Sequence, residues 1–443
     1  MSRFPHALVI IVSFIILAGV ATYLLPKGEY DRTTDPQTNS EVVVPGSFHD
    51  VEAPPLKPFA ILVAIPRGIV AGIEVIISIF ICGACFYVVE KTGALKTGII
   101  FITNKLKGRE QITLWLTGIF FLIGGTLEGM EEELIPLTPV LLMLTRRIGY
   151  NAFVAIGVSY CVAVIGASMS PFNPFGAVLA QKLAGVTLLS GAAFRFSVMV
   201  VAFVVWMMMI MRYARNNRLT KEHEAEPEVS EVSGRHSVIL VIVVLAFAAL
   251  IYGMMFWEWG FNEMSAEFFL VGVLAGLFGG LGINGTSVAF VDGLREMTFA
   301  ALIVGFAHGI PILLTDGKVL DTIIYALLIP TEALPSSLSA VGMMASQSIL
   351  HIVVPSYTGL AALTIPILAP LSDLIGLPRQ VCVLAFQYGA ILMNMISPTN
   401  GAIMAIIALS GIGYDQWFKF VIRRLLVVWA FCALVLILAR FFV

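Results

Sequence analysis

The chain has 443 residues, of which 59% are hydrophobic and only 12% are charged, and its mean hydropathy of +0.95 is far above that of soluble proteins. Most of the chain is therefore expected to lie in a lipid bilayer. The net charge of −2 gives no basic surface for binding nucleic acid. The five cysteines all fall in apolar runs, so neither a disulfide framework nor a Cys/His metal site is expected.

Apolar runs long enough to cross a bilayer, about 20 residues each, recur along the chain. We expect membrane spans near 7–25, 69–90, 150–186, 190–212, 237–256, 265–283, 296–313, 379–413 and 417–442. The runs 150–186 and 379–413 are each interrupted by prolines and polar residues, and so predict broken helices. This pattern predicts an all-α polytopic membrane protein.

Two other apolar regions differ from ordinary spans. In 111–147, two short apolar limbs flank GGTLEGMEEE. At 1.5 Å per residue each limb reaches only about 15–20 Å, which is too short to cross about 30 Å of hydrocarbon. Such a pair of limbs predicts a re-entrant hairpin. Region 336–374, in which two apolar limbs flank PSYTG, is the second hairpin candidate, and its first limb is longer.

Lysine and arginine cluster at 91–109, 146–147, 212–235 and 419–424. Because basic loops stay in the cytoplasm, these clusters predict a cytoplasmic N-terminus, an external C-terminus and hairpins that enter from opposite sides. The polar segment 27–57 is then external. The loop 214–236 is cytoplasmic and separates a first half, 1–213, from a second half, 237–443.

Three sequence landmarks recur in the same order in the two halves, at nearly constant spacing. The matched positions and their offsets are Gly93 and Gly317 (317 − 93 = 224), Pro136 and Pro366 (366 − 136 = 230), and Ser170 and Ser397 (397 − 170 = 227). The span 265–283 has no counterpart in the first half. One additional crossing would invert the second copy, so we expect two inverted repeats, each with a hairpin and a discontinuous helix.

The broken helices carry the motifs SPFN and SPTN where the surrounding sequence is apolar. Proline removes a donor, and a break exposes carbonyl and N–H groups that lipid cannot satisfy. Such groups can hold a cation or an anionic group in a hydrated cavity; the alternative is a proline kink that serves only packing. Two breaks in register favour a substrate or ion site at Ser170, Asn173, Ser397, Thr399 and Asn400. Sodium is an additional candidate ligand at Ser170, Asn173, Ser397 and Asn400.

The hairpin tips are expected to meet the breaks. Their candidate substrate- or ion-binding residues are Thr126, Glu128 and Gly129 in the first tip and Ser356, Thr358 and Gly359 in the second. A carboxylate inside the membrane suits a cationic substrate group, a proton or a metal cation. The alternative for Glu131 to Glu133 is a solvated turn.

Several other polar residues lie in apolar surroundings. Glu131 and His308 are candidates for a proton relay, although a packing histidine is an equal alternative for His308. Gln347, His351, Gln387 and Asn394 either line the cavity or only link helices, and Glu74 is expected to be buried against a neighbouring helix.

Four stretches carry a family resemblance: LPKGEYDR with VVVPGSFH, GGTLEGMEEELIPLTP, GASMSPFNPFG and NMISPTNGAI. With them the chain resembles the ion-transporter superfamily, and within it the DcuC-like C4-dicarboxylate carriers. It is most similar to the YfcC branch, whose members are often described as basic amino-acid antiporters. The resemblance implies an elevator-type transporter fold with two inverted repeats and a homodimer.

The hairpin tips of this chain differ from those of related transporters. Related divalent-anion/sodium symporters bind sodium and carboxylate through Ser-Asn-Thr motifs, whereas this chain has Thr126-Leu127-Glu128 and Ser356-Tyr357-Thr358. An acidic tip repels a dicarboxylate unless a cation intervenes.

These observations predict a secondary active transporter of the bacterial inner membrane rather than an enzyme. It has no nucleotide-binding loop, needs no cofactor beyond a coupling sodium ion or proton, and is expected to carry a small charged metabolite, with basic amino acids favoured. The alternative substrate is a C4-dicarboxylate or short-chain carboxylate. A membrane-embedded hydrolase and a passive channel are the options from other classes, and the hydrolase lacks a metal-ligand pair at helical spacing.

Overall fold

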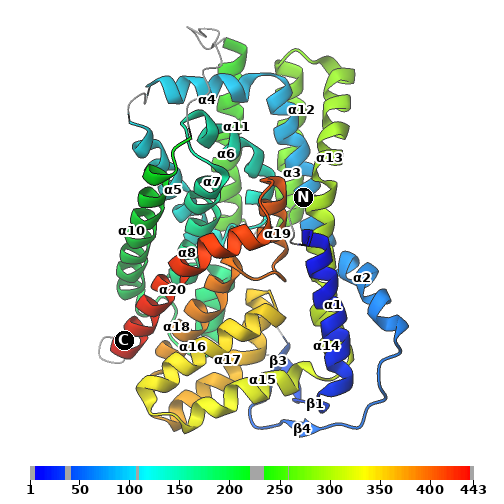
Figure 1. Cartoon of the computed structure of the whole chain (residues 1–443), viewed down its shortest axis with the longest axis vertical. Coiled ribbons are helices and arrows are strands. Elements are labelled where there is room, and N and C mark those ends of the chain that lie inside the picture. Colours follow the sequence, from blue (N-terminus) through cyan, green and yellow to red (C-terminus); the bar gives the residue numbers. More distant parts are fainter. Residues whose placement is uncertain (1–4, 35–40, 106–108, 220–233, 258, 440–443) are drawn as a thin grey trace.

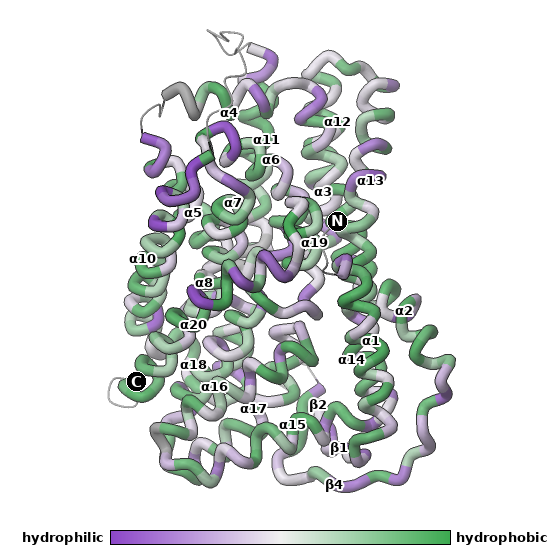
Figure 2. The backbone as a smooth tube through the Cα atoms, in the orientation of Figure 1, coloured by the Kyte–Doolittle hydropathy of each residue, from purple (hydrophilic) through white to green (hydrophobic). Residues whose placement is uncertain are grey.

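The computed structural model describes residues 5–34, 41–105, 109–219, 234–257 and 259–439, and most of these are helical. In chain order the helices are α1 (Ala7–Leu24), α2 (Phe59–Ala71), α3 (Ile73–Lys91), α4 (Ala94–Lys105), α5 (Glu110–Glu128), α6 (Leu134–Arg147), α7 (Ala152–Val158), α8 (Tyr160–Met169), α9 (Leu179–Leu183), α10 (Ala192–Asn216), α11 (Gly234–Phe256), α12 (Phe261–Phe278), α13 (Gly282–Ala307), α14 (Gly309–Asp316), α15 (Leu320–Leu328), α16 (Ser336–Val353), α17 (Tyr357–Leu374), α18 (Arg379–Leu392), α19 (Gly401–Leu409) and α20 (Tyr414–Ala439). Within the described ranges, nine helices are long and apolar enough to cross a membrane. Figure 2 shows hydrophobic residues along most of these long helices.

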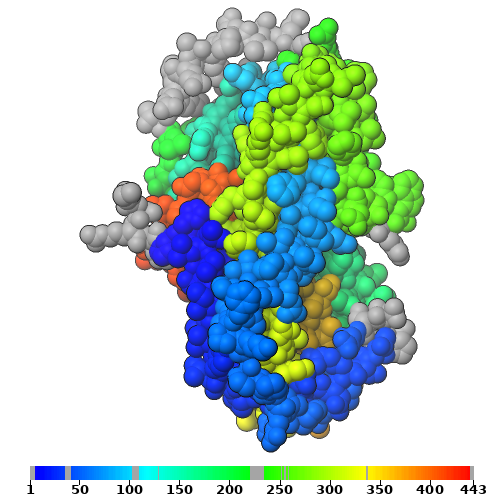
Figure 3. Space-filling view, turned by 90° about the vertical axis from the view of Figure 1, so that its right-hand side faces the viewer, coloured from blue at the N-terminus to red at the C-terminus, as the bar shows by residue number. Residues whose placement is uncertain are grey.

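One side of the molecule is a bundle in which α13 packs against α3, α12 and α2 (Figure 1). Small residues allow the helices to approach closely, as is usual between membrane helices. A Cβ atom at Gly293 of α13 would lie 2.6 Å from the Cα of Ala84 in α3. Helices α1 and α2 both pack against α14, and Figure 3 shows them covering one face of the molecule.

The first hairpin, α5 and α6, begins and ends on the same side of the molecule. Glu110 at the start of α5 forms an ion pair with Arg218 at 3.2 Å, and the adjacent Leu219 donates its N–H to the carbonyl of Gly149, just after α6. The limb α5 has 19 residues, roughly 28 Å, and is therefore longer than the short limb expected. Its helix continues through Gly124, Gly125 and Thr126 and ends only at Gly129, whose φ of 74° is left-handed.

The second hairpin, α16 and α17, lies at the opposite end of the view in Figure 1, where α15 and the strands also lie. Its limb α17 packs against strand β3 (Glu41–Val43), and α16 packs against α15. The packing of the two halves is reciprocal. In each half the first hairpin limb packs against the first part of the broken helix of the same half, α5 on α8 and α16 on α18. The second limb of each hairpin packs against the last part of the broken helix of the other half, α6 on α19 and α17 on α9.

The span expected at 69–90 is α3, which the shorter helix α2 precedes across Gly72. One span boundary was wrong. The span expected at 296–313 is the pair α13 and α14, which runs from Gly282 to Asp316 with a break at His308. The first part of α13 was not expected in a span because residues 284–296 include polar side chains, although these are compatible with a continuous helix. Glu74, expected to be buried, is exposed.

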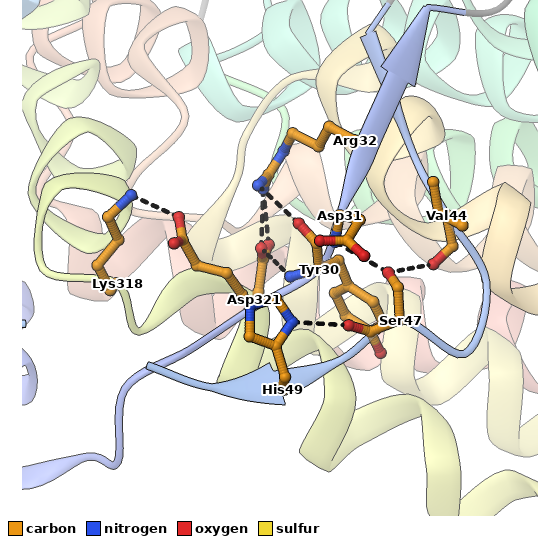
Figure 4. Close-up of polar contacts among 9 residues, drawn as sticks. Tyr30, Asp31, Arg32, Val44, Ser47, His49, Lys318 and Asp321 are labelled. Carbon is orange, nitrogen blue, oxygen red and sulfur yellow. Dashed lines mark hydrogen bonds and ion pairs between the residues drawn. The ribbon is translucent and has the colours of Figure 1, made fainter. Parts of the chain in front are cut away.

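The segment after α1 forms two small antiparallel strand pairs: β1 (Gly28–Glu29) with β4 (His49–Asp50), and β2 (Arg32–Thr34) with β3. Asp321 of α15, only 3% exposed, holds this segment (Figure 4). Its two carboxylate oxygens accept from Nη2 of Arg32 at 3.0 and 2.9 Å, and the N–H of Tyr30 donates to Oδ2 at 3.0 Å. Lys318 forms an ion pair with Glu29. The strand segment is therefore fastened to the helix that leads into the second hairpin.

We predict that Asp321→Asn loosens this segment, because it removes the charge from a buried carboxylate that accepts three hydrogen bonds. The expected loss of stability is roughly 1–3 kcal/mol, measured by thermal unfolding of the purified protein in detergent, with faster proteolysis within 27–57. The control is Asp292→Asn, which breaks the exposed pair with Arg295 and should cost no more than about 0.5 kcal/mol. Equal effects of the two substitutions would contradict the fastening role.

Candidate functional site

The first break, residues 170–173, lies between α8 and a short π-helix, η1 (Pro174–Val178). Ser170 replaces the lost helix bonds: its Oγ accepts the N–H groups of Phe172 and Asn173 at 2.9 and 2.8 Å and donates to the carbonyl of Thr126 at 2.5 Å. Asn173 caps η1 by accepting two N–H groups at 2.9 Å each. The break is thus anchored to the first hairpin, and its exposed backbone groups are satisfied by side chains.

The second break, residues 393–400, has the same chemistry. Asn400 caps α19 by accepting the N–H of Ile403 at 3.0 Å. The hydroxyl groups of Ser397 and Thr399 lie 2.7 Å apart, and Thr399 donates to the carbonyl of Ile352 in the second hairpin at 2.5 Å. All five predicted residues of the two breaks are buried.

The two breaks lie close together. Gln387 of α18 donates its Nε2 to the carbonyl of Ser170 at 3.2 Å, and α18 packs directly against α8. The tip of the first hairpin joins them, because a Cβ at Gly129 would lie 2.8 Å from Nδ2 of Asn173 and 3.8 Å from the ring of Tyr357 in the second hairpin. Elements from both halves of the chain therefore meet at one place.

Glu131, directly after the first tip, is at the centre of this place and is only 2% exposed. Its two carboxylate oxygens each accept from Nδ2 of Asn394 at 2.8 Å, and Oε2 also accepts from the hydroxyl of Tyr160 at 3.1 Å. Asn394 belongs to the second break and Tyr160 begins α8, so both halves hold this one carboxylate. No lysine, arginine or histidine forms an ion pair with Glu131 in the part of the chain that the structure describes.

His351 and Tyr357 of the second hairpin complete the cluster. The Nε2 of His351 lies 2.5 Å from Oδ1 of Asn394, and Nδ2 of Asn394 also donates to the hydroxyl of Tyr357 at 2.5 Å. The imidazole of His351 stacks on the Tyr357 ring at 5.7 Å. Because Oδ1 of Asn394 can only accept, Nε2 of His351 is the protonated nitrogen; Nδ1 is buried and has no hydrogen-bond partner among the described residues.

The first break and the second hairpin tip also carry exposed residues. Phe172 and Phe175 of the first break are 45% and 44% exposed. Ser356, which caps α17 by accepting the N–H of Gly359 at 3.3 Å, and Thr358 are also exposed. Aromatic and hydroxyl groups are thus exposed at the first break and at the second hairpin tip.

The other predicted residues have different positions. Thr126 directs its hydroxyl back to the carbonyl of Leu122 at 2.6 Å, so only its own carbonyl takes part in the break. The side chain of Glu128 lies outside the described residues. Nδ1 of His308 forms a hydrogen bond with the carbonyl of Val304 at 2.9 Å. The ring lies beside Gly72, in the bundle of α2, α3 and α13 rather than in the Glu131 cluster.

Tyr160 was missed by the sequence analysis. Besides Glu131, its hydroxyl contacts the carbonyl of Asn394 at 3.3 Å and Oδ1 of Asn400 at 3.4 Å. A single tyrosine in the apolar run FVAIGVSYCVAVIGA carries no sequence signal for this role; only its place on the helix that leads into the first break hinted at it.

A family model described as the C4-dicarboxylate anaerobic carrier, DcuC, matches residues 4–441. The chain belongs to the DcuC family. It is 30% identical over 470 residues to YfcC of Escherichia coli, whose name describes it provisionally as a basic amino acid antiporter, with 94% of this chain and 92% of YfcC covered. It is 27% identical to an uncharacterised protein of Haemophilus influenzae, covering 95% and 93%. The DcuC family consists of secondary transporters, so this chain is a multi-pass membrane protein that carries a small molecule.

Two solved structures are similar at low scores. One is the YdaH transporter of Alcanivorax borkumensis (TM-score 0.47, 13% identity, 98% of each chain covered). The other is MtrF of Neisseria gonorrhoeae, described with a class of antimetabolite efflux pumps (TM-score 0.44, 15% identity, 99% and 95% covered). At these scores neither structure supports a conclusion about this chain.

We predict that Tyr160→Phe weakens the cluster, because it removes a donor to a buried carboxylate while keeping the ring. The expected loss is about 1–2 kcal/mol, measured as a lower melting temperature in detergent. Tyr252→Phe, at an exposed tyrosine of α11 (51% exposed), is the matched control and should have no measurable effect. A Tyr160→Phe protein as stable as the control would show that this hydroxyl does not stabilise the cluster.

Proposed function

We propose that this transporter binds its substrate where the two breaks and the two hairpin tips meet, and that the substrate is a small charged metabolite, most favourably a basic amino acid. The observation that carries the proposal is the buried carboxylate of Glu131, held by three hydrogen bonds and paired with no basic side chain in the described chain. A buried charge without a counter-charge is costly, so a substrate cation or a proton is its natural partner.

The surroundings suit an amino acid. The N-terminal ends of α17, α19 and η1 lie at the tips and breaks, where helix dipoles favour a carboxylate. The exposed rings of Phe172 and Phe175 offer faces to a cation. The proposed binding residues are Thr126, Glu128, Gly129, Ser170, Asn173, Ser356, Thr358, Gly359, Ser397, Thr399 and Asn400, to which we add Glu131, Tyr160, His351 and Asn394.

The transport cycle follows from the architecture. We propose that 1–213 and 237–443 are inverted repeats joined by the linker 214–236, in accord with the crossed packing of α6 on α19 and α17 on α9. The substrate-holding elements would then move as a unit, in an elevator-type cycle, past the bundle of α2, α3 and α13. Exchange or an ion gradient would drive this movement, with Glu131 as the proton-carrying group when a proton is used. A homodimer in the bacterial inner membrane with a cytoplasmic N-terminus completes the proposal.

A C4-dicarboxylate or short-chain carboxylate is the second candidate substrate, and the description of the family model favours it. In that case a cation must screen Glu131, with sodium held near Ser170, Asn173, Ser397 and Asn400. We prefer the amino acid because the buried carboxylate of Glu131 has no basic partner among the described residues and would repel a second carboxylate.

We predict that purified protein in proteoliposomes exchanges arginine, lysine or ornithine, and that Glu131→Gln lowers the exchange rate at least about 100-fold, because a buried charged contact is worth roughly 3 kcal/mol. Glu74→Gln, at an exposed carboxylate of α3, is the control and should retain wild-type exchange. Saturable counterflow would distinguish a carrier from a channel.

Two results would contradict the proposal. Uptake of succinate or fumarate without any amino-acid exchange would show that the substrate is a carboxylate rather than an amino acid. Full exchange by Glu131→Gln would remove this carboxylate from the substrate site.

A further inference from the structure

Arg195 is a second charged group without a counter-charge within the described ranges of this structure. Arg195, in the first turn of α10, is only 1% exposed, and none of its three guanidinium nitrogens has a hydrogen-bond partner among the described residues. Tyr388 of α18 lies within electrostatic range of this guanidinium and is fully buried, and its hydroxyl has no hydrogen-bond partner in the described part of the chain. A buried guanidinium whose five donors are all unused is strongly unfavourable in an apolar interior.

Other arginines that are partly buried in this structure do have partners. Arg424 donates to the carbonyl of Phe420, and its guanidinium lies 5.0 Å from the centre of the Tyr213 ring. Arg32 is bound by Asp321, and Arg379 by Asp373 and the carbonyl of Ala184. The fold therefore supplies partners to its structural arginines, and Arg195 differs from them.

The loop that leads into α10 borders two hollows that share Lys182. One, of about 560 Å³, is lined by Lys182, Gly185, Val186, Thr187 and Leu188. The other, of about 610 Å³, shares Lys182 and Gly185 and adds Arg379 and residues of β2, β3 and α17. The positive charge of Lys182 beside both hollows raises the local concentration of anions.

The same loop is held tightly just before Arg195. Gln181 donates to the carbonyl of Ser190 at 3.1 Å and accepts the N–H of Leu189 at 3.1 Å, and Gln380 donates to the same carbonyl of Ser190. Leu189 has a φ of 60°, a left-handed conformation that is unfavourable for a leucine. Strain of this kind persists where the surroundings enforce it, and it is concentrated at functional sites.

We propose that Arg195, with the hydroxyl of Tyr388, forms an oxyanion-binding site for a carboxylate or phosphate group that enters from the hollows beside Lys182. The planar guanidinium offers two parallel N–H donors that match the oxygens of either group, and the phenol donates to the same oxygens. The site uses none of the residues that hold Glu131, and it does not depend on the identity of the transported cation. The oxyanion has two sources, a soluble carboxylate or phosphate and the phosphate of an anionic lipid.

The test uses the full-length protein in nanodiscs of neutral phosphatidylcholine. Its melting temperature is measured as potassium succinate or potassium phosphate replaces potassium chloride at constant ionic strength, and again in discs that contain phosphatidylglycerol. Binding to the folded state raises the melting temperature. An increase with the soluble anions identifies a soluble ligand, whereas an increase only with phosphatidylglycerol identifies the lipid phosphate.

The variants locate the effect. Arg195→Gln should weaken the apparent affinity for the effective oxyanion about 10- to 100-fold, the loss expected from charged hydrogen bonds. Tyr388→Phe, which keeps the guanidinium, should weaken it less. Arg215→Gln, at an exposed position of the same helix, is the control and should match wild type.

Two results would overturn the proposal. One is a wild-type melting temperature that responds to neither the soluble oxyanions nor phosphatidylglycerol, a result that requires no variant to fold. The other is a response that persists unchanged in both Arg195→Gln and Tyr388→Phe, which would place the oxyanion elsewhere.

Discussion

A carboxylate buried where two halves of a membrane protein meet is the constraint on which the rest of this structure depends. Hydrocarbon can solvate neither the charge of Glu131 nor the open backbone of a broken helix. Asn394 and Tyr160 provide donors for the charge, and Ser170, Asn173 and Asn400 cap the breaks. Polar groups that would be costly separately satisfy one another when the two halves pack together.

The packing around this centre depends on small residues. Gly166 of α8 lies against the backbone of α5, and Gly389 of α18 lies against the backbone of α16, so that each broken helix touches the first limb of its own hairpin. A side chain at either glycine would separate these backbones and move the tips away from the breaks. Close helix contact thus places the polar residues within hydrogen-bond distance of one another.

Local chemistry made part of this predictable from the sequence. Proline, serine and asparagine in SPFN and SPTN break and cap helices wherever they stand, so both breaks were located. The length of α5 could not be predicted from the sequence, because its glycines could equally well have ended the helix. Among the tip glutamates, sequence could not distinguish Glu131 from Glu128, since only tertiary packing brings Asn394 to Glu131. Tyr160 gave no local signal, because its partners Glu131 and Asn394 lie 29 and 234 residues away in the chain (160 − 131 = 29; 394 − 160 = 234).

Glu131 and Asn394 bind each other across the two halves of the chain. A double-mutant cycle measures this interaction, with Glu131→Gln, Asn394→Leu and the double variant unfolded under the same conditions. We expect a coupling free energy of about 1.5–3 kcal/mol, the strength of hydrogen bonds to a buried charge. Additive effects, with a coupling within about 0.3 kcal/mol of zero, would show that the two side chains do not interact.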